Sequence, residues 1–206
     1  MNTPLRLSQE FDLRSATPSW LQPIAKEDFQ AFLIIYKDKC LFYDHCQAFL
    51  DSEVKNKENA IFGFAHSCLE SDYGRSHIAR KKLNFRGYGA VDNNPSGGAF
   101  GFDAVDDSII KISSYIVRDY LTVGGKFATP FTEKEFDFQL KHNKYWAATP
   151  KNLARWKEKR LRCVEVKPFT LECLNERYAT DAFWDTSIAN IMLRFVAFIN
   201  NKPEVK

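Results

Sequence analysis

The chain of 206 residues, 45% hydrophobic and 27% charged, is long enough for one folded domain and too apolar for intrinsic disorder. Its formal net charge of +3 is too small to indicate nucleic acid as a partner. No apolar run approaches the length of a membrane span, and the first residues lack the basic-then-apolar order of a signal peptide, so we expect synthesis in the cytoplasm.

The five cysteines are odd in number and match no metal-ligand spacing. We expect them to be small buried residues in a reducing environment. The histidines also form no metal-binding pattern with the carboxylates, and His66 is expected to be a core residue. The sequence therefore predicts no metal site and no cofactor.

Residues 1–25 contain three prolines and little periodicity, which predicts an extended N-terminal arm. Apolar residues then recur at spacings of three and four, which predicts a helix over about 26–50, with slippage near Asp38. After a turn, a second helix is predicted over 58–70. It is apolar on most of its surface, so we expect it to be central, with Glu70 at its end.

Residues 72–101 hold six of the nine glycines, which predicts loops and a short β-hairpin. Helical periodicity resumes at Asp106 or Asp107 and stops at Gly124-Gly125. A final helix is predicted over about 181–200. The fold class is therefore α+β, with a mostly helical lobe and a small loop and hairpin lobe.

Residues 126–168 are the least periodic part of the chain, and we predict that they form an insertion in a domain spanning 26–206. TPFTEKEFDFQL is expected to form a helix carrying Phe136 and Leu140. Residues 151–162 hold six basic residues and one Glu, which is typical of a solvated helix face. Trp156 within this run leaves open the binding of an anionic wall polymer.

Two carboxylates lie in this region, Glu70 at the helix end before the glycine-rich loop and Asp92 in a turn within it. Paired carboxylates are what cleavage of a glycosidic bond requires, and partial burial would keep Glu70 protonated for donation. A structural role is the alternative for each. Glu70 could pair with Arg75 or Arg80, and Asp92 could only shape its turn.

Residues 65–95, AHSCLESDYGRSHIARKKLNFRGYGAVDNNP, and the later segment YATDAFW (178–184) occur in a specific order. This string resembles the signature of the peptidoglycan-cleaving N-acetylglucosaminidases of glycoside hydrolase family 73. The resemblance covers about 65–124 and 169–200. It implies a lysozyme-like fold whose two lobes form a cleft.

By this resemblance Glu70 is the general acid, and Asp92 orients water or stabilises positive charge at the anomeric carbon. Tyr178 matches a cleft tyrosine of the family, with core packing as the alternative. Asp103, Asp106 and Asp107 are substitutes for the second carboxylate. The resemblance also implies a substrate-binding set of Tyr73, Asn84, Phe85, Arg86, Tyr88 and Trp184.

Three positions depart from the family pattern: Tyr73 replaces a Trp, Arg86 an apolar residue and Val91 a Tyr. Arg86 is expected either to meet carboxylates of the glycan strand or to project into solvent. The departures affect the binding of individual sugars more than the chemistry.

The predicted function is hydrolysis of the β-1,4 bond after N-acetylglucosamine in peptidoglycan, with glycan strands as the partner. A wall hydrolase without a signal peptide suggests a phage endolysin, or a virion-associated enzyme that contacts virion or tail proteins. The alternatives are a non-catalytic wall-binding or tail structural protein and a muramidase of the same fold. Neither nucleic acid nor a membrane span is expected.

Overall fold

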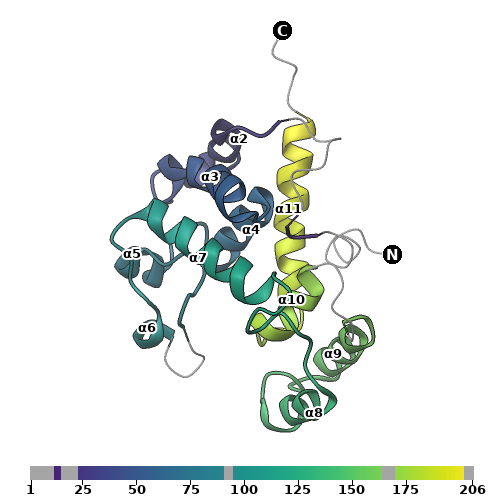
Figure 1. Ribbon diagram of the computed structural model, residues 1–206. Coiled ribbons are helices and arrows are strands. Elements are labelled where there is room, and N and C mark those ends of the chain that lie inside the picture. The colour runs from purple at the N-terminus through teal and green to yellow at the C-terminus, as the bar shows by residue number, and fades with distance from the viewer. Residues whose placement is uncertain (1–11, 15–22, 91–94, 164–169, 202–206) are drawn as a thin grey trace. The chain divides into compact units, whose positions relative to one another are not determined.

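The computed structural model describes residues 12–14, 23–90, 95–163 and 170–201, and every regular element in these ranges is a helix (Figure 1). The mostly helical character is therefore confirmed for the described part of the chain. The elements are α2 (Lys26–Phe32), the 3-10 helices η1 (Ile34–Tyr36) and η2 (Tyr43–His45), α3 (Gln47–Asn56), α4 (Ala60–Glu70), α5 (His77–Lys82), α6 (Pro95–Gly98), α7 (Val105–Tyr120), α8 (Glu133–His142), α9 (Pro150–Arg162), α10 (Leu171–Tyr178) and α11 (Trp184–Asn200).

The predicted single helix over 26–50 is wrong, because α2 ends at Phe32 and two 3-10 turns separate it from α3. Phe29 and Phe42 are both 0% exposed. In one straight helix they would lie about 140° apart around the axis, on nearly opposite faces. The break in the helix lets both rings reach the core.

The predicted hairpin within 72–101 is also not found among the described residues, where α5 and α6 form instead. Phe100 N–H donates to the Tyr88 carbonyl, and Phe102 N–H donates to the Lys82 carbonyl. These two bonds join the two segments, but the Asn84 amide also donates to the Tyr88 and Phe100 carbonyls. A side chain thus takes a place that a strand ladder would fill with backbone groups.

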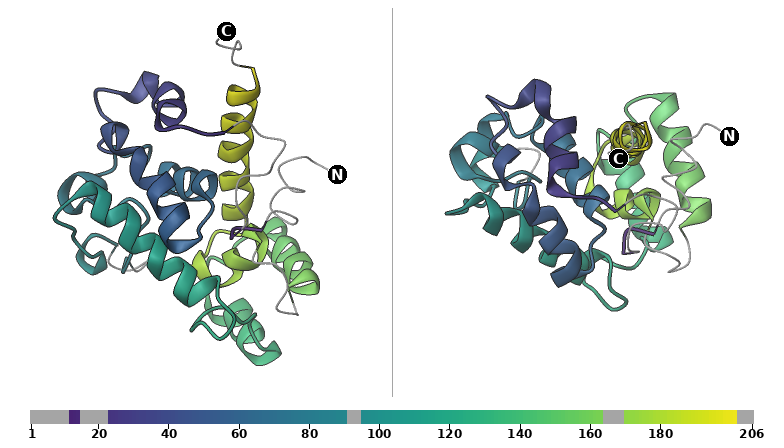
Figure 2. Two further views of the ribbon diagram at one scale, coloured as in Figure 1. Left: turned by 45° about the horizontal axis from the view of Figure 1, so that its top comes forward. Right: turned by 90° about the horizontal axis from the view of Figure 1, so that it is seen from above.

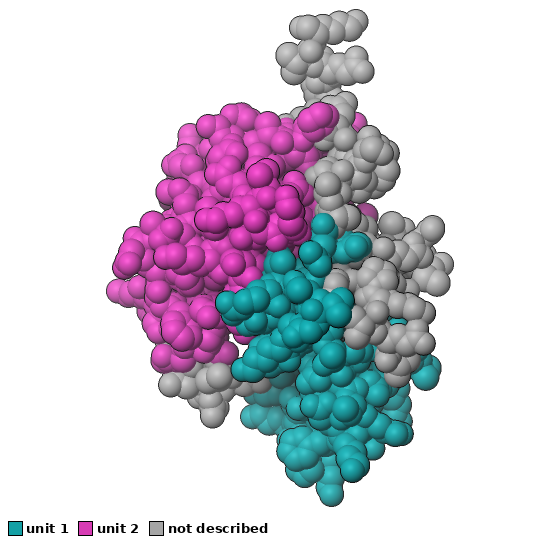
Figure 3. All heavy atoms as spheres, viewed as in Figure 1, with its two compact units in different colours: residues 1–14, 116–190 teal, residues 15–115, 191–206 magenta. Residues whose placement is uncertain are grey.

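The chain divides into two compact units (Figure 3). Unit 1 comprises residues 1–14 and 116–190, and unit 2 comprises residues 15–115 and 191–206. Two of the three boundaries, at 115/116 and 190/191, fall inside α7 and α11. None of the helices in the described ranges is both long and apolar enough to cross a membrane.

The core of unit 2 is built around α4, as predicted, and α4 lies beside α3 (Figure 1 and Figure 2). Every residue of α4 from Ala60 to Cys68 is buried. Aromatic rings fill the space around it: Phe29 lies 4.6 Å from Phe64 and is stacked on Phe195 at 4.8 Å between ring centroids. This packing fixes α4 and so fixes the position at which it ends.

The core of unit 1 contains two stacked indole rings, Trp146 and Trp156, with centroids 4.0 Å apart. Phe136 meets Trp146 edge-on at 5.5 Å. The predicted helix carrying Phe136 is confirmed as α8, which begins with a capping box at Thr132. Trp156 is 0% exposed and belongs to this core, and the binding of an anionic polymer by the basic run stays a prediction.

Candidate functional site around Glu70

Glu70 is the last residue of α4, at the point where the chain leaves the core of unit 2. At the other end of the helix, the Asn59 side chain caps it by accepting from Ile61 N–H and Phe62 N–H. The Glu70 side chain keeps 24% of its surface exposed. A buried and capped helix thus presents a carboxylate to solvent from a fixed position.

The chain turns sharply after Glu70. Asp72, Tyr73 and Gly74 all have positive φ values, of 51°, 54° and 76°. A Cβ atom on Gly74 would lie 3.0 Å from Leu41 N, so a side chain does not fit there. Non-glycine residues in this conformation cost of order 1 kcal/mol each and cluster at functional sites.

The glycine-rich loop reaches the Glu70 carboxylate through Gly87, which has φ of 66°. A Cβ atom placed on Gly87 would lie 3.7 Å from Glu70 Oε2, so the loop backbone passes directly beside the carboxylate. Asn84 holds this loop. Its amide donates to the Tyr88 carbonyl at 2.8 Å and its oxygen accepts from Tyr88 N–H at 3.0 Å.

His66 lies one turn before Glu70, with 3.9 Å between His66 Nε2 and Glu70 Oε1. The ring is buried and stacks on Phe62, so the expectation of a core histidine is confirmed. Burial holds the pKa of His66 well below its usual range, and the charge of Arg86 lowers that pKa further. His66 is therefore a neutral neighbour of Glu70 near pH 7.

The two arginines considered as ion-pair partners of Glu70 have other contacts. Arg75 Nη2 lies 2.6 Å from Asp72 Oδ1, and its guanidinium lies over the Tyr36 ring. Arg80 Nε donates to the Arg75 carbonyl at 2.9 Å. These contacts do not contradict the prediction of a chemical role for Glu70, which stays a prediction.

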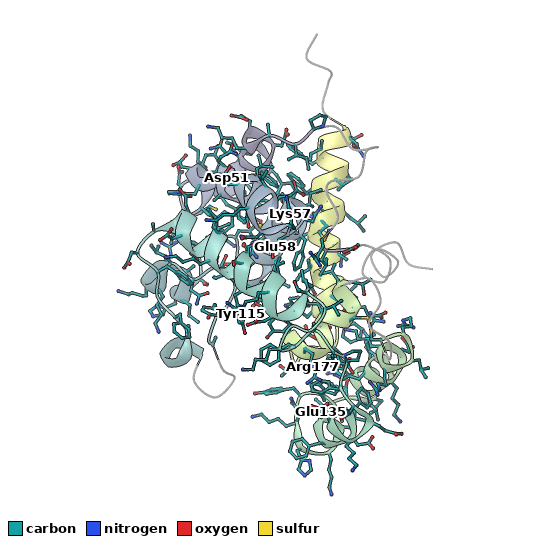
Figure 4. The ribbon with its side chains drawn as sticks, viewed as in Figure 1. Asp51, Lys57, Glu58, Tyr115, Glu135 and Arg177 are labelled. Carbon is teal, nitrogen blue, oxygen red and sulfur yellow. A yellow bond between two sulfur atoms is a disulfide. The ribbon has the colours of Figure 1, made fainter. Side chains whose placement is uncertain are left out.

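Arg86 does not project into solvent, and its predicted contact with substrate stays a prediction. Arg86 is 1% exposed, and its Nη1 lies 2.8 Å from both carboxylate oxygens of Glu58 (labelled in Figure 4). Its Nε donates to Ser67 Oγ. Gly63 makes the room for this pair, because a Cβ there would lie 2.7 Å from Arg86 Nη2.

Three other residues of the predicted substrate-binding set are also buried, and their assignment to substrate binding stays a prediction. Phe85 is 1% exposed and meets Phe42 edge-on in the core of unit 2. Asn84 is 2% exposed, because its amide is used to hold the loop. Trp184 is 4% exposed in unit 1, where its ring lies 5.0 Å from that of Tyr178.

Tyr73, Tyr88 and Tyr178 remain half-buried. Tyr73 stacks on Tyr36 at 4.4 Å, and burial raises the pKa of its phenol. Tyr178 ends α10 in unit 1 and contacts the ring of Tyr120. The roles given to these three tyrosines stay predictions.

The second carboxylate is not located in the structure, since Asp92 lies outside the described residues. Asp106 and Asp107 lie in the first turn of α7. They engage His45 at 2.9 Å and Lys111 at 2.8 Å. Asp103 is exposed just before α7 and remains an alternative.

The basic run of α9 is not simply a solvated face, because Arg155 and Lys159 are buried in unit 1. Asp185 accepts from both, with Arg155 Nη2 at 2.7 Å and Lys159 Nζ at 2.8 Å. Glu172 pairs with Arg155 at 2.9 Å and with Arg162 at 2.6 Å. Sequence reasoning missed this network, although the i, i+4 spacing of Arg155 and Lys159 places them on one helix face.

A second contact ties α10 to the segment before α8. Arg177 donates to the Thr129 and Pro130 carbonyls and lies 3.4 Å from Glu135 Oε2 (Figure 4). Its guanidinium also covers the Phe131 ring at 3.8 Å. The residue before Tyr178 is thereby fixed within unit 1.

Cys163 and Cys173 form a disulfide, so the expectation that all five cysteines are unpaired is wrong. The other three cysteines are free and buried, as predicted. No group of three or more His, Cys, Asp or Glu side chains among the described residues is arranged to hold a metal ion.

Residues 46–196 match the glucosaminidase family, described as mannosyl-glycoprotein endo-beta-N-acetylglucosaminidase. Among curated proteins, a putative endo-beta-N-acetylglucosaminidase of Streptococcus pneumoniae serotype 4 is 35% identical over 103 residues, and that of strain R6 matches to the same extent. The aligned region covers 50% of this chain and only 16% and 15% of these relatives.

Solved structures show the same mostly helical, lysozyme-like fold. Autolysin E of S. aureus has a TM-score of 0.57 at 18% identity, over 95% of this chain and 73% of that one. A catalytic mutant of autolysin E in complex with the disaccharide NAG-NAM has a TM-score of 0.53 at 20% identity, over 91% and 71%. Glucosaminidase B of S. aureus has a TM-score of 0.51 at 20% identity, over 96% and 67%.

Proposed function

This chain belongs to the endo-β-N-acetylglucosaminidase family of glycoside hydrolases, and from that premise we propose that it cleaves peptidoglycan with Glu70 as general acid. The proposed bond is the β-1,4 linkage after N-acetylglucosamine. The family match over 46–196 spans Glu70, Asp92 and Tyr178. Autolysin E, which shares the fold, has been solved with NAG-NAM and with a muropeptide, which supports a glycan strand as the substrate.

The observation that carries the proposal is the placement of Glu70. Its carboxylate stands at the end of a buried helix, 24% exposed and beside the backbone of Gly87. Its neighbour His66 is neutral, so that ring adds no positive charge that would favour the ionised carboxylate. A general acid needs this combination of a fixed position, partial burial and access to the leaving oxygen.

In the proposed reaction, Glu70 donates its proton to the glycosidic oxygen while positive charge develops on the sugar ring. Asp92 is proposed to orient water or to stabilise that charge, and Tyr178 to contact the sugar or its N-acetyl group. An inverting route, a retaining route and assistance from the 2-acetamido group all use Glu70 as the proton donor in the first step. They differ in what attacks the anomeric carbon.

A zymogram on purified cell wall tests the proposal. Wild-type protein should produce clearing, and Glu70→Gln should abolish it because an amide cannot donate the proton. Glu27→Gln, which makes the same change at an exposed position in the first turn of α2, should clear like wild type. Equal clearing by Glu70→Gln and wild type would refute the assignment of Glu70.

The same preparations distinguish the alternative functions. Binding to the wall by wild type without any clearing would indicate a wall-binding or tail structural protein. Clearing that leaves N-acetylmuramic acid at the new reducing ends would indicate a muramidase. Association with a phage virion, or release as an endolysin, stays a prediction, because the relatives bear on the enzyme class and not on its origin.

A further inference from the structure

Phe100 presents an aromatic ring on the surface of unit 2, with 57% of the residue exposed. A single exposed aromatic residue is ordinary and by itself indicates nothing. The ring of Tyr88 is stacked on the ring of Phe100, with centroids 4.9 Å apart and an interplanar angle of 29°. Tyr115 (labelled in Figure 4) in turn meets Tyr88 edge-on at 4.5 Å.

Hydrogen bonds and close packing fix the position of the Phe100 ring. Phe100 N–H donates to the Tyr88 carbonyl at 2.9 Å, and the Asn84 amide donates to the Phe100 carbonyl at 3.0 Å. The ring lies over Gly89, where a Cβ atom would come within 2.3 Å of Phe100 Cδ2. An exposed ring held in this way has already lost most of the freedom that binding would otherwise cost.

The loop that supports Phe100 also reaches the proposed general acid. Gly87 lies beside Glu70 Oε2, and the next residue is Tyr88, on which Phe100 stacks. Glu70, Gly87, Tyr88 and Phe100 all belong to unit 2. A glycan strand with a glycosidic oxygen at Glu70 would extend over neighbouring surface of this same loop.

The chemistry of the exposed ring fits a sugar. One face of a pyranose ring carries C–H groups, and a flat aromatic surface buries that face while the hydroxyl groups at the edge stay hydrated. Tyr88 is less suited to this role than its prediction from the sequence suggests, because Phe100 covers one of its faces. Phe100 is the more accessible of the two rings, with 57% of the residue exposed, whereas Tyr88 is half-buried.

We propose that Phe100 is a substrate-positioning residue whose exposed face stacks on a pyranose ring of the strand being cleaved at Glu70. The inference rests on the proposed function, because the glycan strand is its ligand. It adds a sugar-binding position that the family signature in this sequence does not include.

Co-sedimentation with purified, insoluble peptidoglycan tests this inference, with all variants made in the Glu70→Gln protein so that the wall is not consumed. Phe100→Ala and Phe100→Leu should each raise the dissociation constant about three- to tenfold, since each removes the aromatic face. Phe100→Trp should retain binding. Thermal melting curves that match those of the Glu70→Gln parent show that each variant is folded.

Phe138 provides a matched control. It is also 57% exposed and stacked on one neighbouring ring, that of His142, but it lies on α8 in unit 1. Phe138→Ala should bind like the parent. In the otherwise wild-type enzyme, Phe100→Ala should raise KM more than it lowers kcat, because the ring binds sugar without taking part in proton transfer.

The possible outcomes separate this inference from the proposed function. Equal dissociation constants for Phe100→Ala and Phe138→Ala would overturn the inference even if wild type cleaves the wall. Loss of binding only in Phe100→Ala and Phe100→Leu, with no cleavage by wild type, would refute the proposed catalysis and keep Phe100 as a glycan-binding residue. Failure of the Glu70→Gln parent to bind peptidoglycan would overturn the inference.

Discussion

Arg86 and Glu58 form a buried ion pair beside α4, with each side chain 1% exposed. Arg86 departs from the family pattern, and the structure explains the departure without a role in binding. The charge is neutralised inside unit 2, against a helix that has a glycine at the point of contact. Such a pair contributes little net stability, but removal of one partner leaves an uncompensated buried charge.

Arg86→Met should therefore lower the free energy of unfolding by about 3–5 kcal/mol, as measured by urea denaturation. The double variant Arg86→Met/Glu58→Leu should recover part of this loss, because neither charge is then buried. Arg80→Met, at an exposed position, should change stability little. A double variant less stable than Arg86→Met would contradict the account of the pair.

Glu176 is a second residue whose buried environment should affect stability, in this case by making it depend on pH. It is 3% exposed on α10, and burial raises the pKa of its carboxyl to about 7, against the opposing charge of Arg160. The protonated form is thus favoured in the folded state. Stability should fall as pH rises from the ordinary pKa of the unfolded chain, near 4.5, to about 7.

Glu176→Gln should remove this dependence, because the amide mimics the protonated acid. The variant should match wild type near pH 4.5 and should be more stable by about 3 kcal/mol near pH 7.5. Glu133→Gln, at an exposed position of α8, provides the control. Parallel stability curves for wild type and Glu176→Gln between these pH values would show that the buried carboxyl does not titrate as inferred.

At the scale of elements, α9 and α10 are joined by both charge and a covalent bond. Arg155 and Arg162 of α9 pair with Glu172 of α10, at 2.9 Å and 2.6 Å, and Cys163, at the end of α9, is bonded to Cys173 within α10. Disulfides persist in oxidising environments, which agrees with the proposed action on a cell wall. The buried network requires the two helices to stay in register, and the disulfide enforces that register.

Alkylation followed by mass spectrometry tests the disulfide directly. The unfolded, unreduced protein should carry three labels, on Cys40, Cys46 and Cys68, and five labels after reduction. Cys163→Ser should lower the free energy of unfolding by about 2–3 kcal/mol, as expected for a loop of this length. Five labels without reduction would show that the bond is absent.

For the whole molecule, the sequence was sufficient where local pattern and tertiary packing agree. Helix α4 and its terminal Glu70 were predicted because most positions of α4 are apolar, and α11 was predicted from its period. The segment from Phe29 to Phe42 was mispredicted because burying both rings requires a break, which the periodicity marked only as slippage near Asp38.

The features of the site that could not be predicted from the sequence also depend on tertiary packing. A motif identifies which residue types recur but not which way they face. Arg86 turned inward because of Glu58, a residue 28 positions earlier in the chain, and Trp184 is buried in unit 1. The disulfide was not predictable, since five cysteines allow many pairings. Phe100 lay outside the motif positions, and only its exposure and its support by Tyr88 single it out.

The most direct test of the central claim is mass spectrometry of the muropeptides released from purified wall, after reduction of the new sugar ends. Wild type should release fragments ending in reduced N-acetylglucosamine, and Glu70→Gln should release none above background. Release of the same fragments by Glu70→Gln at a rate close to that of wild type would contradict the claim that Glu70 is the proton donor.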